Sequence, residues 1–401
     1  MGALTSTEQA IVERAANEPM LEQVFEWAAI NSGSRNLGGL ATIASLLGDA
    51  FAGLPGEIAL LDPSTVDAVD PAGKTIDLQH GQNLHLKVRP EAPVQLLFTG
   101  HMDTVFGLEH AFQETRWLDD DVINGPGTAD MKGGIAVMLA ALKAIEASGA
   151  TNIGYEVVIN SDEEVGSLGS ASLIAEAARG KKAALTYEPS ALPDGTLAGA
   201  RPGSGNFAIT IHGRSAHAGR NPEDGRNALT AAAHLALLFE AMRQPGLTVN
   251  PAKIDGGSPS NVVPDIAILR VNLRPATPEL QKIAQAMIDE AIALVSTERD
   301  VQIHAHGGFA RPPKPMTPEA EALFGLVKQA GADLGQTIGW QASGGVCDGN
   351  NIAACGVPVV DTMGVRGGRI HSMEEFLIVE SLKERAALSA LTILRLAGGA
   401  A

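Results

Sequence analysis

Apolar runs that end in polar turns alternate with helical stretches in the first half of the chain. Residues 94–98, 155–160 and 183–187 read as strands, and residues 133–148 and 168–178 read as helices between them. Strands that alternate with helices favour a mostly parallel sheet, with the ligand crevice at the carboxyl ends of the strands. The pattern therefore predicts an α/β fold whose functional residues lie just beyond those ends.

Histidines and carboxylates stand where these apolar runs end. They are His101, Asp103, Asp130, Glu163, Glu164 and Glu188, with His371 in a turn near the C-terminus. Two imidazoles and several carboxylates are a ligand set for a pair of divalent metals, with one carboxylate left over as a base. This arrangement indicates a metallohydrolase.

The adjacent glutamates are expected to divide the work. Side chains of neighbouring residues in an extended backbone diverge, so Glu163 and Glu164 cannot both bind one metal. One can ligate while the other accepts a proton from water. Beside His101, the carboxylate of Asp103 can fix the tautomer of a metal-binding imidazole. Taken singly, each motif also has a plainer interpretation, such as Asp130 capping the helix that follows it.

Length and pattern predict two domains. A chain of 401 residues is too long for one ordinary core. The pattern changes near Gly199, where strand, helix, strand, helix and strand signals lead to a proline-rich linker at 311–315. We expect a catalytic domain in residues 1–200 and 314–401, interrupted by an inserted domain at residues 201–313.

Bulk properties exclude several classes of partner. The formal net charge of −17 argues against nucleic acid and anionic membranes, since both need clustered Lys and Arg. No apolar stretch approaches the ~18 residues of a membrane span. The two cysteines, Cys347 and Cys355, fit a reducing compartment, so we expect a cytoplasmic protein.

Three motifs resemble those of a known family. Residues 98–105, 127–134 and 162–166 are similar to the metal motifs of the co-catalytic dinuclear zinc metallopeptidases and amidohydrolases. That family includes glutamate carboxypeptidase (carboxypeptidase G), acetylornithine deacetylase, succinyl-diaminopimelate desuccinylase and aminoacylase. The resemblance implies two Zn²⁺ per chain, with Co²⁺ or Mn²⁺ able to substitute. It also implies that the inserted domain is a ferredoxin-like α/β dimerisation (lid) domain, which makes a homodimer.

The resemblance also implies a role for each site residue. Asp130 would bridge both metals, His101 and Glu188 would complete one ion, and Glu164 and His371 would complete the other. Glu163 would be the general base, and Asp103 would orient His101. The peptide bond between Asp130 and Met131 would be cis.

Further residues match the family's substrate site. His217, in the segment 213–219, matches a histidine that reaches the neighbouring subunit's active site and stabilises the oxyanion. Asn261 and Arg311 match positions that hold the substrate carboxylate.

The chain departs from its glutamate-preferring relatives at one point. A lysine and a serine that read the glutamate side chain are replaced by Thr196 and Ala198, which leaves glutamate preference open. Arg201 is one candidate replacement. The resemblance assigns no role to Arg274, Lys132 or Cys347.

Together these features predict a zinc-dependent hydrolase. Its substrate would be a small molecule with a free carboxylate: an N-acyl amino acid, or a short peptide that loses its C-terminal residue. Deacetylation of a basic amino acid and cleavage of di- and tripeptides stay open as alternatives. A catalytically silent metal-containing binding protein is the non-enzyme alternative.

Overall fold

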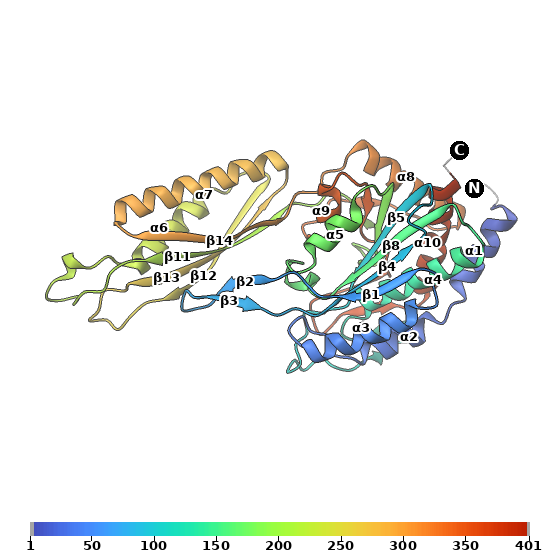
Figure 1. The fold of residues 1–401 in the computed structure, drawn as a ribbon, viewed down its shortest axis with the longest axis horizontal. Coiled ribbons are helices and arrows are strands. Elements are labelled where there is room, and N and C mark those ends of the chain that lie inside the picture. The colour runs from blue at the N-terminus through green and yellow to red at the C-terminus, as the bar shows by residue number, and fades with distance from the viewer. Residues whose placement is uncertain (1–3, 399–401) are drawn as a thin grey trace.

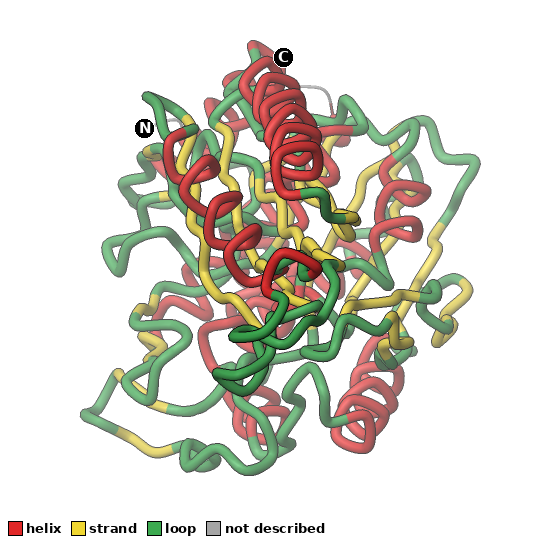
Figure 2. The backbone as a smooth tube through the Cα atoms, turned by 90° about the vertical axis from the view of Figure 1, so that its left-hand side faces the viewer, coloured by secondary structure: helices red, strands yellow, loops and turns green. Residues whose placement is uncertain are grey.

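The computed structural model describes residues 4–398. The molecule is elongated, with a larger α/β part at one end and a smaller one at the other (Figure 1). Helices and strands are interleaved throughout the molecule, as Figure 2 shows from the end of the smaller part. None of the helices within the described range has an apolar stretch long enough to span a membrane.

A six-stranded sheet forms the centre of the larger part, in the order β1-β4-β8-β5-β9-β16. Its strands are β1 (Glu57–Leu61), β4 (Asn83–Val88), β5 (Val94–His101), β8 (Ile153–Asn160), β9 (Ala183–Thr186) and β16 (Val359–Val360). The ladders β8–β5, β5–β9 and β9–β16 are parallel, while β1 and β4 pair antiparallel. The expected mostly parallel sheet is confirmed.

Helices cover both faces of this sheet. Helices α1 (Ser6–Ala16), α2 (Met20–Ala28), α3 (Leu37–Phe51), α4 (Gly133–Ala147), α8 (Pro318–Asp333) and α10 (Glu380–Gly398) share one core with it. Helices α5 (Ala171–Ala178) and α9 (Asp348–Ala354) pack on the other face. Helix α4 is nearly all buried because α1, α2 and α10 pack over it. The turn that precedes α4 is therefore held on a rigid support.

The smaller part is a second α/β sandwich. Its antiparallel sheet has the order β12-β13-β11-β14. The chain runs through β11 (Ser204–His212), α6 (Ala228–Ala241), β12 (Leu247–Gly256), β13 (Ile266–Pro275), α7 (Pro278–Arg299) and β14 (Gln302–Arg311). Both helices pack on one face around a separate core. This is the ferredoxin-like order expected, and we propose residues 201–313 as the inserted domain.

A hairpin of the larger part reaches this second sheet. Strands β2 (Val66–Val69) and β3 (Thr75–Leu78) lie between the two parts in Figure 1. Arg270 Nη2 donates to the carbonyl oxygen of Val69 at 2.9 Å, and His306 Nε2 lies 3.1 Å from Asp67 Oδ1. The hairpin therefore braces the sheet face opposite α6 and α7.

Small sheets complete the larger part. Strands β17 (Gly367–Gly368), β18 (Phe376–Ile378), β7 (Val122–Asn124) and β6 (Arg116–Trp117) form one, and β10 (Leu197–Ala198) pairs with β15 (Trp340–Gln341). Strands β17 and β18 flank His371. The loop that carries this histidine is therefore fixed at both ends by strand pairing.

Several boundaries differ from the sequence expectation. The apolar spacing of residues 8–30 predicts a single helix, but Pro19 has no backbone N–H and the chain forms α1 and α2. The sequence pattern predicts a last helix over residues 374–396, but α10 begins at Glu380, because the residues before it form β18. Strand β12 was not expected. It is a largely exposed edge strand that contains Pro251, so it lacks the apolar alternation of a buried strand.

Candidate active site

Parallel pairing gathers the predicted ligands at one edge of the central sheet. His101 ends β5, and in the parallel ladder it pairs with Asn160, the last residue of β8. Glu163 and Glu164 follow that strand, and Glu188 follows β9 on the other side of β5. Because parallel strands end at the same edge, residues distant in sequence become neighbours.

Asp130 lies between two histidines. Its Oδ1 is 3.1 Å from His101 Nε2, and its Oδ2 is 3.3 Å from His371 Nε2. It sits in the irregular turn Thr128–Lys132, and the Asp130–Met131 peptide bond is cis, as the family resemblance implies. One carboxylate thus presents one oxygen to each imidazole.

A further carboxylate faces each histidine. Glu188 Oε2 lies 3.7 Å from His101 Nε2, and Glu164 Oε2 lies 3.1 Å from His371 Nε2. The structure therefore brings all five predicted metal ligands together, in the two sets expected around Asp130.

The tightest ligand clusters are grouped somewhat differently. Ligand atoms of His101, Asp130 and Glu164 lie within 4.8 Å of one another, as do those of His101, Glu163 and Glu188. His371, whose side chain is half exposed, belongs to neither group. His371 nevertheless contacts Asp130 and Glu164 directly, which places its nitrogen at the shared carboxylate.

The buried carboxylates of the site are stabilised in their ionised forms by nearby positive charge. Hydrogen bonds with Asp130 and then Glu164 raise the pKa of His371 to about 11. Burial, followed by the charge of Asp130, raises the pKa of Glu164 to about 8, and burial raises that of Glu163 to about 7. Burial acts against ionisation of Asp130 too, yet its two histidines lower its pKa. Nitrogen and oxygen donors in this arrangement fit divalent metals such as zinc.

Asp103 holds more than His101. Its carboxylate Oδ1 is 3.4 Å from His101 Nδ1, but its own carbonyl oxygen is closer to that nitrogen, at 3.0 Å. The carboxylate also accepts the backbone N–H groups of Glu163 and Glu164, at 3.1 and 3.2 Å, and the hydroxyl of Ser34 at 2.7 Å. Asp103 therefore positions the glutamate pair as well as the histidine.

The two glutamates do diverge, although in a short helical turn rather than an extended backbone. Glu164 faces His371, whereas Glu163 Oε1 lies 2.7 Å from Arg311 Nη2. The same guanidinium group is 3.5 Å from Asp348 and donates to Ser167 Oγ at 2.8 Å. Arg311, predicted to bind a substrate carboxylate, thus lies beside the predicted base.

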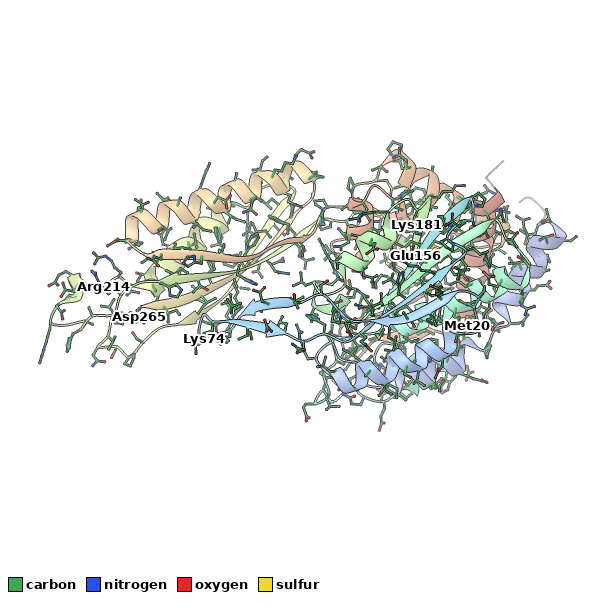
Figure 3. The ribbon with its side chains drawn as sticks, in the orientation of Figure 1. Met20, Lys74, Glu156, Lys181, Arg214 and Asp265 are labelled. Atoms are coloured by element: carbon green, nitrogen blue, oxygen red, sulfur yellow. The ribbon has the colours of Figure 1, made fainter. Side chains whose placement is uncertain are left out.

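His217 and Asn261 lie elsewhere in the same chain. The two residues are neighbours. The backbone N–H of Ala218 donates to the carbonyl oxygen of Asn261 at 3.0 Å, and His217 forms an isolated antiparallel β-bridge with Val262. Arg214 and Asp265, which flank these segments, are labelled in Figure 3 at the far end of the inserted sheet. Within one chain the structure does not bring these two residues to the metal ligands.

Two cavities flank the ligands. One, of about 610 Å³, is lined by Asp130, Glu163, Glu164, Glu188 and His371 together with Arg201, Ala198, Cys347, Thr362 and Phe376 among others. The other, of about 660 Å³, holds Arg311 and Arg274 in its wall beside Glu163 and His371. Space for a substrate therefore extends to both sides of the ligand cluster.

Other side chains around the site now have defined contacts. Arg201 donates to Asp361 through Nε and Nη2 at 2.8 and 3.1 Å, and Lys314 Nζ is 3.0 Å from the same buried carboxylate. Arg274 donates to the carbonyl of Gly344 at 2.9 Å. Lys132 donates to the carbonyl of Ile30, and burial lowers its pKa to about 8.

Sequence reasoning missed Ser34, Asp348 and Glu375, which contact site residues through buried hydrogen bonds or ion pairs. None has a distinctive local pattern. The one signal available was the position of Glu375, four residues after His371.

The fold and this ligand cluster define a metal-dependent hydrolase of amide bonds. Residues 97–395 match the model of peptidase family M20/M25/M40. The chain belongs to that family, and the resemblance inferred from the motifs is confirmed.

Individual relatives agree. Carboxypeptidase G2 of Pseudomonas sp. (strain RS-16) is 31% identical over 338 residues, which cover 81% of this chain and 80% of the relative. A tripeptidase of Staphylococcus aureus superimposes with a TM-score of 0.73 at 25% identity, covering 99% of this chain and 100% of that one.

A third similar structure shares the fold at lower sequence identity. A Bacillus subtilis protein described as a dinuclear metal-binding peptidase of the M20 family has the same fold, with a TM-score of 0.65 at 16% identity. It covers 97% of this chain and 99% of its own.

Proposed function

We propose that this chain is a dinuclear zinc hydrolase that releases an amino acid from an N-acyl amino acid or from the C-terminus of a short peptide. The observation that carries the proposal is the position of Asp130 between two histidines, with the separate carboxylate of Glu163 beside them. His101, Asp130 and Glu188 would hold one ion. Asp130, Glu164 and His371 would hold the other.

When bound, zinc supplies Lewis acidity that polarises the scissile carbonyl and lowers the pKa of water in the site. Glu163 then serves as the base: it takes a proton from the attacking water and returns it to the leaving nitrogen. Burial keeps its pKa near neutrality, at about 7, so it can both accept and release that proton. Asp103 holds its backbone in place.

A substrate carboxylate is proposed to bind Arg311. Planar guanidinium groups match the two oxygens of a carboxylate. Arg311 lines a cavity next to the ligand cluster, and its buried Nε has no hydrogen-bond partner within residues 4–398. The side chain thus has capacity for a further acceptor.

We further propose that the active unit is a homodimer. His217 and Asn261 lie together at the far end of the inserted sheet, remote from the ligands of their own chain. In a dimer formed through that sheet, they would complete the partner's site, where His217 would donate to the developing oxyanion and Asn261 would bind substrate.

The first cavity favours an acidic or neutral side chain on the released amino acid. Arg201 lines this cavity and shares the buried anion Asp361 with Lys314, which does not line it, so the cluster beside the cavity holds two cations for one anion. Glu188 also attracts Arg201 but is assigned to a metal. A buried uncompensated charge is unfavourable, and an anionic substrate group would compensate it. Ornithine-like substrates are disfavoured for the same reason.

A peptide substrate remains the second candidate. The Staphylococcus aureus tripeptidase matches nearly the whole chain, and space on both sides of the ligands can take residues on either side of the cleaved bond. Comparing N-acetyl, N-aroyl and di- and tripeptide substrates with the same released residue separates these possibilities.

Replacing the base tests the mechanism. Glu163→Gln keeps the shape of the side chain but cannot accept the proton, so kcat should fall by about 10²- to 10⁴-fold. Metal analysis should still find two ions per chain, because Glu163 is not a ligand in the proposal. A variant that keeps most of its turnover would remove Glu163 from the mechanism.

Mixing two inactive variants tests the dimer. His217→Ala and Glu163→Gln should each be nearly inactive alone, for different reasons. A mixed dimer holds one site with both residues intact, so random pairing should restore about a quarter of wild-type activity. Mixed dimers purified through two different tags should show about half of the wild-type activity, because one of their two sites is intact. Purified mixed dimers that stay inactive would place His217 outside the partner's site.

A substrate series tests the cavity. With one acyl group throughout, kcat/KM should be highest for N-acylglutamate, lower for N-acylglutamine and lowest for N-acylornithine. Arg201→Met should reduce the value for N-acylglutamate by about 10- to 100-fold, as expected for a lost hydrogen bond to a charged group. Asp361 keeps Lys314 as its partner in this variant.

Arg369→Met is the matched control. That arginine also lines the cavity but is exposed and already paired with Glu374. The control should change the series little. Equal turnover of N-acylornithine and N-acylglutamate, or an equal loss on all substrates in Arg201→Met, would contradict this assignment.

A further inference from the structure

Glu375 is a fully buried carboxylate that the proposed mechanism does not use. It lies four residues after His371, and its side chain reaches the turn that carries Asp130. Oε1 accepts the N–H groups of Ala129 and Asp130 at 2.9 and 3.1 Å, and Oε2 accepts that of Gly127 at 3.3 Å. Three backbone donors of one turn thus converge on one carboxylate.

The conformation of the turn explains why these donors need an outside partner. Asp130 has φ −115° and ψ 88°, and Met131 has φ −137° and ψ 35°, so neither continues a helix. The backbone N–H groups of Gly127, Ala129 and Asp130 therefore find their acceptor in Glu375 and not within the turn. A carboxylate satisfies several donors at once, which an apolar residue of the same size would leave unpaired.

Ionisation of the buried Glu375 carboxylate is energetically unfavourable unless other groups stabilise it. Burial, followed by the nearby charge of Asp130, raises the pKa of Glu375 to about 7, while the three backbone hydrogen bonds favour the ionised form. The three hydrogen bonds offset this cost by satisfying donors that an apolar side chain would leave unpaired, and they tie the carboxylate to the turn of Asp130.

The same residue belongs to the loop of the second histidine. Asn124 Nδ2 donates to the carbonyl oxygens of Glu375 and Met373 at 2.7 and 3.1 Å, which anchors the loop to β7. The N–H of Glu375 donates to the carbonyl of Ser372 at 3.1 Å. His371 itself has a left-handed backbone, with φ 63°, and a half-exposed ring. The loop needs such an anchor to present that ring at a fixed place.

We infer that Glu375 is a positioning residue that fixes the carboxylate of Asp130 in its bridging orientation and sets its spacing from His371. The inference rests on the proposed dinuclear function. Glu375 would not touch the metals or the substrate. It would act through the main-chain N–H of Asp130 and through its own loop. These contacts would keep the carboxylate of Asp130 and the ring of His371 at a fixed distance from each other.

Loss of the hydrogen bonds between Glu375 and the turn of Asp130 should weaken metal binding and turnover more than substrate binding. Outer partners of metal ligands typically contribute about 10- to 100-fold in metal affinity or activity. The carboxylate oxygens of Asp130 are shared, so a rotated Asp130 would affect both ions, while a displaced loop would affect the ion at His371 most.

Glu375→Gln in the full-length protein tests the inference. The side chain keeps its shape, but one oxygen becomes an NH₂ group that faces backbone donors. We expect apparent Zn²⁺ affinity, measured by competition with a chelator, to fall about 10- to 100-fold for at least one ion. At saturating metal, kcat should fall while KM changes little, and the visible spectrum of the Co²⁺-loaded protein should change.

Glu374→Gln is the matched control, because that neighbouring glutamate is exposed and pairs only with Arg369 among its ionic contacts in residues 4–398. It should bind metal and turn over substrate like the wild type. Should Glu375→Gln fail to fold, Asn124→Ala loosens the same loop and is expected to shift affinity and the Co²⁺ spectrum in the same direction, by a smaller factor.

The outcomes separate two failures. A wild-type protein that binds fewer than two ions and hydrolyses no substrate of the panel contradicts the proposed function. A wild type that binds two ions, with Glu375→Gln showing unchanged affinity, kcat and Co²⁺ spectrum, overturns the inference about Glu375 alone. A variant that loses only thermal stability of the metal-free protein also overturns it, since that result describes a structural residue.

Discussion

One carboxylate shared between two imidazoles organises the site. Asp130 offers an oxygen to His101 on one side and to His371 on the other, and each outer glutamate faces the histidine on its own side. In two-metal sites the ions lie about 3.5–4 Å apart, a spacing that a single bridging carboxylate can set. The fold serves this arrangement by placing the turn of Asp130 on the buried helix α4.

The distribution of charged side chains connects the site to its surroundings. Asp130, Glu163, Glu164 and Glu188 are largely buried at one sheet edge, where burial makes ionised carboxylates unfavourable. Divalent cations and Arg311 supply the positive charge that such a cluster needs. Arg201 lines the first cavity together with these carboxylates and shares Asp361 with Lys314, so that neighbouring cluster has two cations for one anion. A protein of net charge −17 thus has a locally cationic cluster next to the ligand site.

The sequence predicts where the candidate ligands His101, Glu163, Glu164 and Glu188 lie in the fold, because one rule governs these four positions. Parallel strands end at a common edge, so polar residues just past 98, 160 and 187 converge whatever lies between them. His371 follows no such strand; its residue type made it a candidate ligand, and the family resemblance gave it a partner metal. The roles of these residues stay proposals.

Other parts of the structure depend on contacts that a local pattern does not encode. Glu375 and Asp348 look like ordinary acidic residues until the fold brings backbone donors or a guanidinium to them. Strand β12 forms because an exposed edge segment meets β13, and its own residues alternate poorly. His217 lies far from the metal ligands of its own chain, and a local sequence pattern does not encode that distance.

The most direct measurement is anomalous diffraction from crystals grown with zinc, with data collected on both sides of the zinc absorption edge. The account predicts two ions, one among His101, Asp130 and Glu188 and the other among Asp130, Glu164 and His371. Both should contact Asp130. A single ion, or two ions of which only one touches that carboxylate, would contradict it.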